Sequence, residues 1–263
     1  MDYKQITLQA ITIVKSVRTF IKQELGKVDA QAIEEKSLNS LVSYVDRTAE
    51  EKLVDGLGKI LPQATFLTEE ETVEQQQSDL QWIIDPLDGT TNFLFSIPIF
   101  SVSVALKHND ELVVGIVHEV NQDESFYAWK SGGAYLNEKP IRVSQNTTLA
   151  EGLIATGFPY YDYSLMPKYF NALEALMQGT RGIRRLGSAA VDLAYVACGR
   201  FDAFYEYSLN IWDVAAGILL VREAGGRVSD FKGQKENLTG AEIVATSAQV
   251  YDPFFSIINK AFY

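Results

Sequence analysis

Two stretches near the amino terminus place apolar residues three or four positions apart, which is the period of an α-helix. The first runs from Ile6 to Ile21, with lysine and arginine on its other face, and the second runs from Ala49 to Ile60. Each stretch therefore predicts an amphipathic helix with one buried face. We expect the first helix to end near Gly26, and Asp46 is a suitable N-cap for the second.

From Phe100 to Val143 the apolar positions change to a period of two, which is the period of a strand. The runs are separated by turn-forming residues, among them Asn109-Asp110 and Gly132-Gly133. This pattern predicts an antiparallel meander in the first half of the chain. Two shorter strands are expected before it, at Ala64–Leu67 and at Trp82–Ile84.

After about Glu151 the pattern alternates between strands and helices, which predicts a mixed α/β second half. The expected strands are Leu153–Thr156, Gly182–Leu186, Phe201–Tyr205 and Ile243–Thr246, and the expected helices are Ser188–Ala197, a helix that begins at Asp213, and a last helix from about Gln249 to Ala261. The two halves meet near residue 150 without a long linker. We therefore expect one domain over residues 1–263 with a continuous core.

The composition is that of an ordinary folded protein, because 47% of the 263 residues are hydrophobic and 22% are charged. The net charge of −11 argues against nucleic acid or an anionic membrane surface as a partner. No apolar run resembles a signal peptide or a membrane span, so we expect a cytoplasmic location. The single Cys198 lies in an apolar run and is expected in the core, and two histidines are too few for a zinc site.

The chemistry concentrates in Trp82–Phe93, where a short apolar strand runs into two carboxylates, Asp85 and Asp88. Pro86 fixes its own φ and favours an extended Asp85, and Gly89 lets the chain turn. Such a turn can aim both carboxylates and a main-chain carbonyl at one point. Oxygen ligands without thiolate or imidazole suit Mg²⁺. The alternative is a turn in which the two carboxylates only cap the backbone.

Two further acidic features accompany that turn. The segment Glu206–Gly217 places Asp213 where a helix begins, so Asp213 is a candidate metal ligand. It can also be an N-cap or a first-turn acid favoured by the helix dipole, and the two roles are compatible. The run Glu69–Glu71 follows an expected strand. Such a run is usually solvated, but one of its members could join Asp85 and Asp88.

Three segments, in this order, resemble the inositol monophosphatase family of metal-dependent, lithium-sensitive sugar phosphatases. They are Glu69-Glu70 after a strand, Asp85-Pro86-Leu87-Asp88-Gly89-Thr90-Thr91, and Trp212-Asp213-Val214-Ala215-Ala216-Gly217. The likeness runs through nearly the whole chain. It implies an α/β fold in five αβαβα layers, and members of the family are commonly homodimers.

The resemblance also implies roles for individual residues. Two or three Mg²⁺ ions would be ligated by Glu69, Asp85, Asp88, Asp213 and the carbonyl of Leu87. Thr90 and Glu69 would orient the attacking water, and Asp46 would hold the threonine hydroxyl. The substrate would be bound by Asp88, Gly89, Thr90, Thr91, Gly187, Ser188, Ala189, Glu206 and Asp213, with the loop Thr156–Pro159 beside it. The sequence departs from the family at Asn39–Ser43, where relatives often carry an acid. This departure puts in doubt whether the loop after Lys36 helps to bind a third metal ion.

We therefore expect a Mg²⁺-dependent phosphatase that hydrolyses myo-inositol monophosphate or a similar polyol phosphate by direct attack of metal-activated water. Without cations the converging carboxylates would be a liability, since two unit charges ~4 Å apart repel by roughly 4 kcal/mol at an effective dielectric of 20. The alternative substrates are 3′-phosphoadenosine 5′-phosphate, fructose 1,6-bisphosphate and NADP. Arg184 and Arg185 could hold a second phosphate, or they could belong to a solvated surface or an interface.

Three other classes of protein are weighed against this expectation. A haloacid-dehalogenase phosphatase needs a nucleophilic Asp two residues before Asp88, and that residue is Pro86. A non-catalytic scaffold would keep the fold and bind a protein or RNA, but no expected metal ligand is missing. A protein that only binds Mg²⁺ or Ca²⁺ would not need the water-orienting pair of Glu69 and Thr90.

Overall fold

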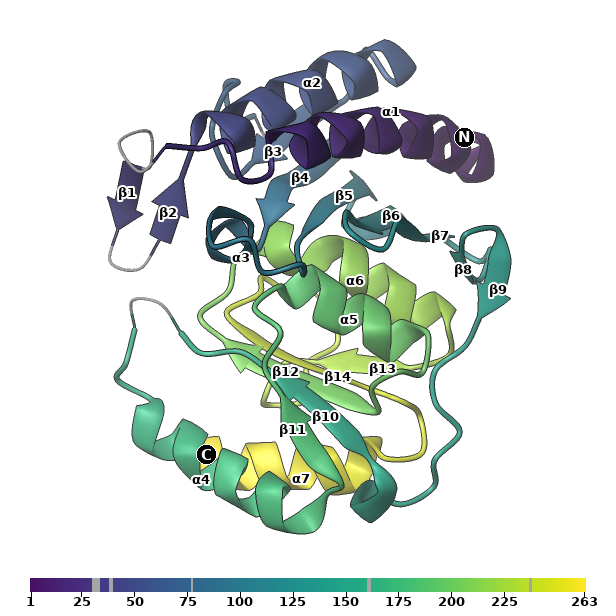
Figure 1. Cartoon of the computed structure of the whole chain (residues 1–263). Coiled ribbons are helices and arrows are strands. Elements are labelled where there is room, and N and C mark those ends of the chain that lie inside the picture. The colour runs from purple at the N-terminus through teal and green to yellow at the C-terminus, as the bar shows by residue number, and fades with distance from the viewer. Residues whose placement is uncertain (30–33, 38–39, 77, 160–161, 237) are drawn as a thin grey trace.

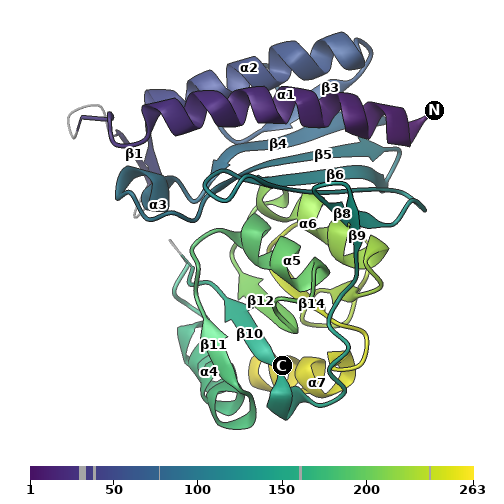
Figure 2. The same ribbon diagram turned by 45° about the vertical axis from the view of Figure 1, so that its right-hand side comes forward.

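Helices and sheets alternate in five layers in the computed structural model, which describes residues 1–29, 34–37, 40–76, 78–159, 162–236 and 238–263 (Figure 1). Helices α1 (Tyr3–Glu24) and α2 (Tyr44–Ile60) cover one face of the first sheet. Helices α5 (Ala189–Ala197) and α6 (Ile211–Glu223) lie between the two sheets (Figure 2). The outer face of the second sheet carries α4 (Met166–Gly179) and α7 (Tyr251–Phe262). This arrangement confirms the layered α/β fold.

The two amino-terminal helices form where the apolar period predicts them. Helix α1 begins after Asp2, whose carboxylate accepts a hydrogen bond from a main-chain amide of the first turn. Helix α2 begins after Ser43, so the prediction that Asp46 is its N-cap was wrong. Asp46 is the third residue of the helix, and its side chain accepts a hydrogen bond from the Ser43 amide at 2.8 Å. The two residues form a capping box.

The first sheet has the strand order β3-β4-β5-β6-β7-β8-β9. From β5 to β9 each strand pairs antiparallel with the next, which confirms the meander. Strand β4 is antiparallel to β5 but parallel to β3. The strands are β3 (Thr65–Thr68), β4 (Leu80–Asp88), β5 (Ser101–His108), β6 (Glu111–Glu119), β7 (Glu124–Trp129), β8 (Ala134–Leu136) and β9 (Lys139–Ile141).

The second sheet has the order β11-β10-β12-β14-β13 and mixes the two directions. Strand β10 is parallel to both of its neighbours, and β14 is antiparallel to both of its own, which confirms the mixed second half. The strands are β10 (Leu153–Thr156), β11 (Gly182–Arg184), β12 (Ala203–Tyr207), β13 (Arg227–Ser229) and β14 (Glu242–Thr246), and the outer helices are α4 (Met166–Gly179) and α7 (Tyr251–Phe262).

Several elements were not predicted from the sequence. They are helix α4, strand β13, the short helix α3 (Thr90–Leu94), the 3₁₀ turn Leu149–Glu151 and the hairpin of β1 (Glu34–Ser37) with β2 (Ser40–Val42). Several predicted boundaries shift: β4 extends to Leu80–Asp88 from the predicted Trp82–Ile84, β11 ends at Arg184 and not at Leu186, and α6 begins two residues before Asp213. Strand β12 begins and ends two residues later than predicted. Within the described ranges, no helix is long and apolar enough to cross a membrane.

The central apolar cluster joins the two halves of the chain. It contains Ile83 and Val117 from the first sheet, Val191 and Val214 from the helices of the middle layer, and Ala245 from the second sheet. Burial of a continuous apolar surface is the main favourable contribution to folding. We propose on this basis that residues 1–263 fold as one domain.

Gly115 allows the middle layer to approach the first sheet. A Cβ at Gly115 would lie 2.7 Å from the carbonyl oxygen of Ala216 in α6, so Gly115→Ala should push the helix away and lower the free energy of unfolding by about 1–3 kcal/mol. Gly58→Ala is the matched control. Its Cβ would meet only the Phe66 ring at 3.8 Å, and alanine in a helix should add roughly 0.5–1 kcal/mol. Urea unfolding of both variants measures the difference, and equal shifts would contradict the close approach.

Candidate active site

Strand β4 delivers two carboxylates to one end of the first sheet. The strand continues through Asp85 to Asp88, with a break in its pairing register between these two residues. Gly89 then takes a φ of 97°, a left-handed conformation that favours glycine. A Cβ there would also lie 3.2 Å from the Gly187 carbonyl oxygen. The turn therefore needs glycine both for its conformation and for the close approach of the loop before α5.

Both carboxylates of this turn also bind the backbone, as the alternative interpretation expected. The Leu87 amide donates to Asp85 Oδ1 at 2.9 Å. Asp88 Oδ2 accepts from the Ser188 hydroxyl at 2.6 Å and from the Ala190 amide at 2.7 Å. Asp88 thus ties the end of β4 to the start of α5. Because each carboxylate has two oxygens with several acceptor positions, capacity remains for another ligand.

Thr90 connects the same turn to helix α2. Its hydroxyl lies 2.9 Å from Asp46 Oδ1 and 3.0 Å from the Leu87 carbonyl oxygen, and it can donate its one proton to either. Asp46 Oδ2 accepts from both the amide and the hydroxyl of Ser43 at 2.8 Å. Burial raises the pKa of Asp46, and these hydrogen bonds favour its charged form. The structure therefore brings Asp46 and Thr90 together, as the sequence predicted.

Glu69 follows strand β3 and lies at the edge of the cleft. Its amide donates to the Ile84 carbonyl at 3.2 Å, which fixes the glutamate beside β4. The next residues are held by Glu50, a buried acid on α2 that accepts from the Glu70 amide at 2.7 Å and the Thr72 amide at 2.9 Å. The sequence analysis did not single out Glu50. Its position on the apolar face of α2, four residues after Asp46, was the available signal.

Asp213 reaches the cleft from the first turn of α6. The helix begins after the N-cap Asn210, and Asp213 Oδ2 accepts from the Asn210 amide at 2.6 Å. The prediction of a first-turn acid is confirmed, and the alternative of an N-cap is wrong. The helix dipole favours a carboxylate at this position.

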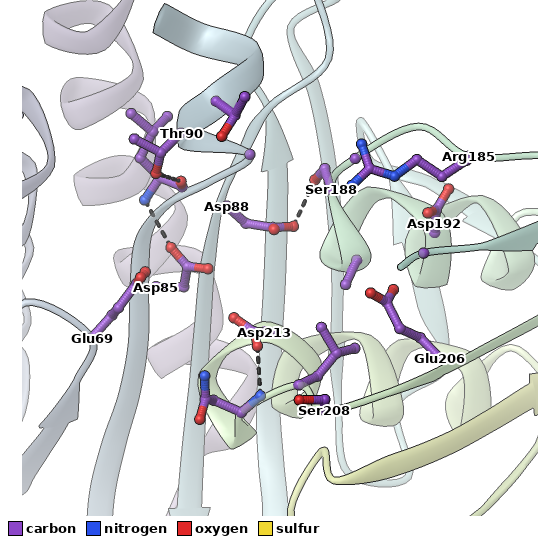
Figure 3. Close-up of a pocket in the computed structure, with 18 of the residues that line it drawn as sticks. Glu69, Asp85, Asp88, Thr90, Arg185, Ser188, Asp192, Glu206, Ser208 and Asp213 are labelled. Carbon is purple, nitrogen blue, oxygen red and sulfur yellow. Dashed lines mark hydrogen bonds between the residues drawn. The ribbon is translucent and has the colours of Figure 1, made fainter. Parts of the chain in front are cut away.

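These acids line one cleft that the first sheet, the middle layer and β12 of the second sheet all reach, with Asp88 and Asp213 between Glu69 and Asp85 on one side and Glu206 on the other (Figure 3). Burial, and then the charge of Glu69, raise the pKa of Asp85 and of Asp213 well above the usual range. Burial raises the pKa of Asp88 to about 6. A buried group of repelling oxygen donors fits a hard divalent cation such as Mg²⁺.

Asp85 lies close enough to Glu69 and to Asp213 for their side chains to interact. Among the residues that the structure describes, no group of three His, Cys, Asp or Glu side chains could hold an ion by itself. Leu41 lines the cleft from the side of the loop after Lys36. Asn39 of that loop lies outside the described residues, so the departure noted at Asn39–Ser43 stays a prediction.

The remaining predicted substrate residues lie around the same cleft. Gly89, Thr91, Gly187, Ser188, Ala189 and Glu206 all line it. From the predicted loop Thr156–Pro159, Gly157 also lines it, and a Cβ there would lie 2.1 Å from Glu206 Oε2, so the glycine makes room for the glutamate. Sequence reasoning missed Asp192, Ser208, Leu209 and Asn210, which complete the wall.

The acidic cleft predicts how the stability of the metal-free protein depends on pH. The pKa of Asp88 rises from 3.8 to about 6 on folding, so the folded state binds this proton more tightly than the unfolded state does. The free energy of unfolding should therefore fall as the pH rises through that window, by on the order of 1 kcal/mol between pH 5 and pH 7. Urea unfolding in EDTA at pH 5 and pH 7 should show a smaller fall for Asp88→Asn than for the wild type. The same fall in both proteins would contradict this assignment.

The layered fold and the acid-lined cleft define the class of protein as a layered α/β protein with a candidate site for a divalent cation. Residues 2–259 match the inositol monophosphatase family, and the chain belongs to that family. It is 40% identical over 255 residues to a protein named Nus factor SuhB from Pseudomonas aeruginosa, covering 95% of this chain and 94% of that one. It is 39% identical over 241 residues to the inositol-1-monophosphatase of Mesorhizobium japonicum, covering 91% of each chain.

A solved structure shares the fold at similar identity. The extragenic suppressor protein suhB from Bartonella henselae superposes with a TM-score of 0.90 at 37% identity and covers 98% of both chains. Family membership confirms the resemblance drawn from the three sequence segments.

Proposed function

We propose that this chain is a Mg²⁺-dependent hydrolase of phosphate monoesters that acts on myo-inositol monophosphate or a similar polyol phosphate and releases inositol and phosphate. One observation carries the proposal: four acids from three segments, namely the residues after β3, strand β4 and helix α6, line one cleft, next to a threonine hydroxyl held by a buried carboxylate. Family membership and the inositol-1-monophosphatase among the relatives support it.

The proposed ligands of two or three Mg²⁺ ions are Glu69, Asp85, Asp88, Asp213 and the Leu87 carbonyl. Bound Mg²⁺ would lower the pKa of the attacking water and neutralise charge on the phosphoryl oxygens and the leaving alkoxide. The donor set fits this role because it consists of oxygens only, and because burial and then the nearby acids raise the pKa of Asp85 and Asp213 when no cation is present.

The residues of the chain itself orient the reacting groups. Asp46 holds the Thr90 hydroxyl at 2.9 Å, so Thr90 is fixed to present an oxygen to the water, with Glu69 as its second partner. The amides of Gly89 and Thr90 face the phosphate. Glu206 and Asp213 accept hydrogen bonds from hydroxyls of the leaving group, and the segment Gly187–Ala189 forms the wall beside its ring.

The test is phosphate release from myo-inositol 1-phosphate, glycerol 2-phosphate, fructose 1,6-bisphosphate, 3′-phosphoadenosine 5′-phosphate and NADP. We expect the highest kcat/KM with inositol 1-phosphate. If another phosphate dominates, the hydrolase assignment stands and the substrate assignment is wrong. Single turnover in ¹⁸O-labelled water should place the label in the released phosphate. A trapped phosphorylated aspartate would overturn direct attack by water.

The homodimer, the sensitivity to lithium and the cytoplasmic location stay predictions from the family resemblance and the composition. Sedimentation equilibrium at micromolar concentration tests the first, and a chain that remains a monomer would contradict it. Inhibition of phosphate release by Li⁺ tests the second.

A second candidate function comes from the relatives. Several proteins about 40% identical to this chain are named Nus factor SuhB, so identity alone does not choose between that role and hydrolysis. The alternative is a scaffold that keeps the fold and binds a protein or RNA. The net charge of −11 disfavours direct binding of RNA. Absence of turnover on every phosphate of the panel, by a folded chain in Mg²⁺, would favour the scaffold.

A further inference from the structure

Asp192 is a buried acid that the proposed reaction does not yet use. It lies one turn into α5, next to Ser188 and Ala189, and it lines the cleft on the side of Glu206 (Figure 3). The residue is only 1% exposed, and among the residues that the structure describes its Oδ1 has no hydrogen-bond partner. Buried polar groups are normally hydrogen-bonded, so an unpaired carboxylate oxygen at a cleft indicates a missing donor.

The charges around Asp192 limit which chemical group can donate this missing hydrogen bond. Asp192 feels the negative charges of Glu206 and Asp88 and the positive charge of Arg185. Glu206 feels the same guanidinium. Arg185 is thus shared by two buried carboxylates, and its guanidinium carbon lies 5.5 Å from the centroid of the Phe158 ring. A second phosphate group on the substrate would be repelled by both carboxylates, and the one guanidinium that could attract it is already shared by them.

We propose that Asp192 and Glu206 form a pair of acceptors for neighbouring hydroxyl donors of the leaving group. Asp192 thereby makes the site selective for monophosphates with a neutral polyol leaving group over bisphosphates. This inference rests on the proposed function and adds a specificity residue to it. It also argues against a second-phosphate site at the arginine pair, because Arg185 balances the acids of the cleft.

The test compares Asp192→Asn with the wild type on three substrates in Mg²⁺. These are myo-inositol 1-phosphate, cyclohexyl phosphate, which has the same ring without hydroxyls, and fructose 1,6-bisphosphate. The variant should lower kcat/KM for inositol 1-phosphate by roughly 10- to 100-fold more than for cyclohexyl phosphate, the size expected for a hydrogen bond to a charged group. The ratio of fructose bisphosphate to inositol phosphate turnover should rise.

The matched control is Asp55→Asn, which removes an exposed acid paired only with Lys59 on the surface of α2 and should leave all three rates as in the wild type. Equal losses on inositol 1-phosphate and cyclohexyl phosphate, or no loss on either, would overturn the role of Asp192. No turnover of any substrate by the wild type would instead overturn the proposed function.

A measurement of stability separates this role from a structural one. Asp192→Asn keeps the shape of the side chain and removes the repulsion between Asp192 and the acids Glu206 and Asp88. The variant should therefore melt at or above the Tm of the metal-free wild type while its preference for inositol 1-phosphate falls. Asp192→Ser serves as a second variant and should lose the same selectivity. A lower Tm in both variants, together with unchanged selectivity, would show that the carboxylate only supports the fold.

Discussion

Asp88→Asn should reduce kcat/KM for myo-inositol 1-phosphate by roughly 1000-fold or more. Loss of a residue that supports a metal ligand typically costs about 10- to 100-fold, and Asp88 is proposed to bind the metal itself. The substitution preserves the shape of the side chain, and the amide oxygen can still accept from the Ser188 hydroxyl and the Ala190 amide. The loss should therefore arise from the missing charge and not from misfolding.

Isothermal titration with Mg²⁺ checks the cause of that loss. The variant should bind Mg²⁺ more weakly than the wild type, whereas Asp55→Asn, which changes an exposed acid outside the cleft, should bind it normally. A variant that is inactive but binds Mg²⁺ like the wild type would contradict the role of Asp88 as a ligand. A fully active variant would contradict its place in the site.

Thr90→Val should lower kcat about 100-fold or more while KM changes little. Valine keeps the size of threonine but removes the hydroxyl that lies 2.9 Å from Asp46 and 3.0 Å from the Leu87 carbonyl. The water would then lose a partner that is needed mainly in the transition state, and such losses appear in kcat.

Thr90→Ser is the matched control because it keeps the hydroxyl and should retain most of the activity. Steady-state kinetics of both variants on inositol 1-phosphate measure the split between kcat and KM. Full activity of the valine variant would show that the hydroxyl is not needed, and equal loss in both variants would show that the loss of the hydroxyl does not by itself explain the effect. A rise in KM alone would place Thr90 in substrate binding and not in orienting water.

The sequence predicted the acids of the cleft because they lie in short segments with unusual composition. Asp85 and Asp88 flank a proline at the end of an apolar strand, and Asp213 follows a tryptophan at a helix start. The structure brings them together through the pairing of β4 and the packing of α6 on the first sheet. Their roles as ligands stay predictions until metal binding is measured.

Asp192 and Glu50 could not be found in the same way. Each is a single acid in a helical segment, and the position of Glu50 on the apolar face of α2 does not indicate which groups it contacts. Only tertiary packing buries Asp192 beside Glu206 and places Glu50 under the loop that follows β3. The cap of α2 was misassigned for a related reason, because Ser43 and Asp46 can both cap and the hydrogen bonds decide between them.

Strand pairing was harder to predict than strand existence. The meander from β5 to β9 follows from short turns, which force neighbouring strands to pair antiparallel. The parallel pairing of β3 with β4 depends on packing, which a single sequence does not specify. Helix α4 was missed although Tyr169, Ala172 and Leu176 are its buried residues, because the exposed Phe170 and Met177 obscure the helical period.

The most direct measurement is phosphate release from myo-inositol 1-phosphate by the wild-type chain, stripped with EDTA and then titrated with Mg²⁺. We expect no release without the metal and a saturable rate with it, because the buried acids of the cleft can bind a phosphate only when cations neutralise them. Equal rates in EDTA and Mg²⁺, or no release at any Mg²⁺ concentration by a chain that circular dichroism shows to be folded, would contradict the proposed hydrolase.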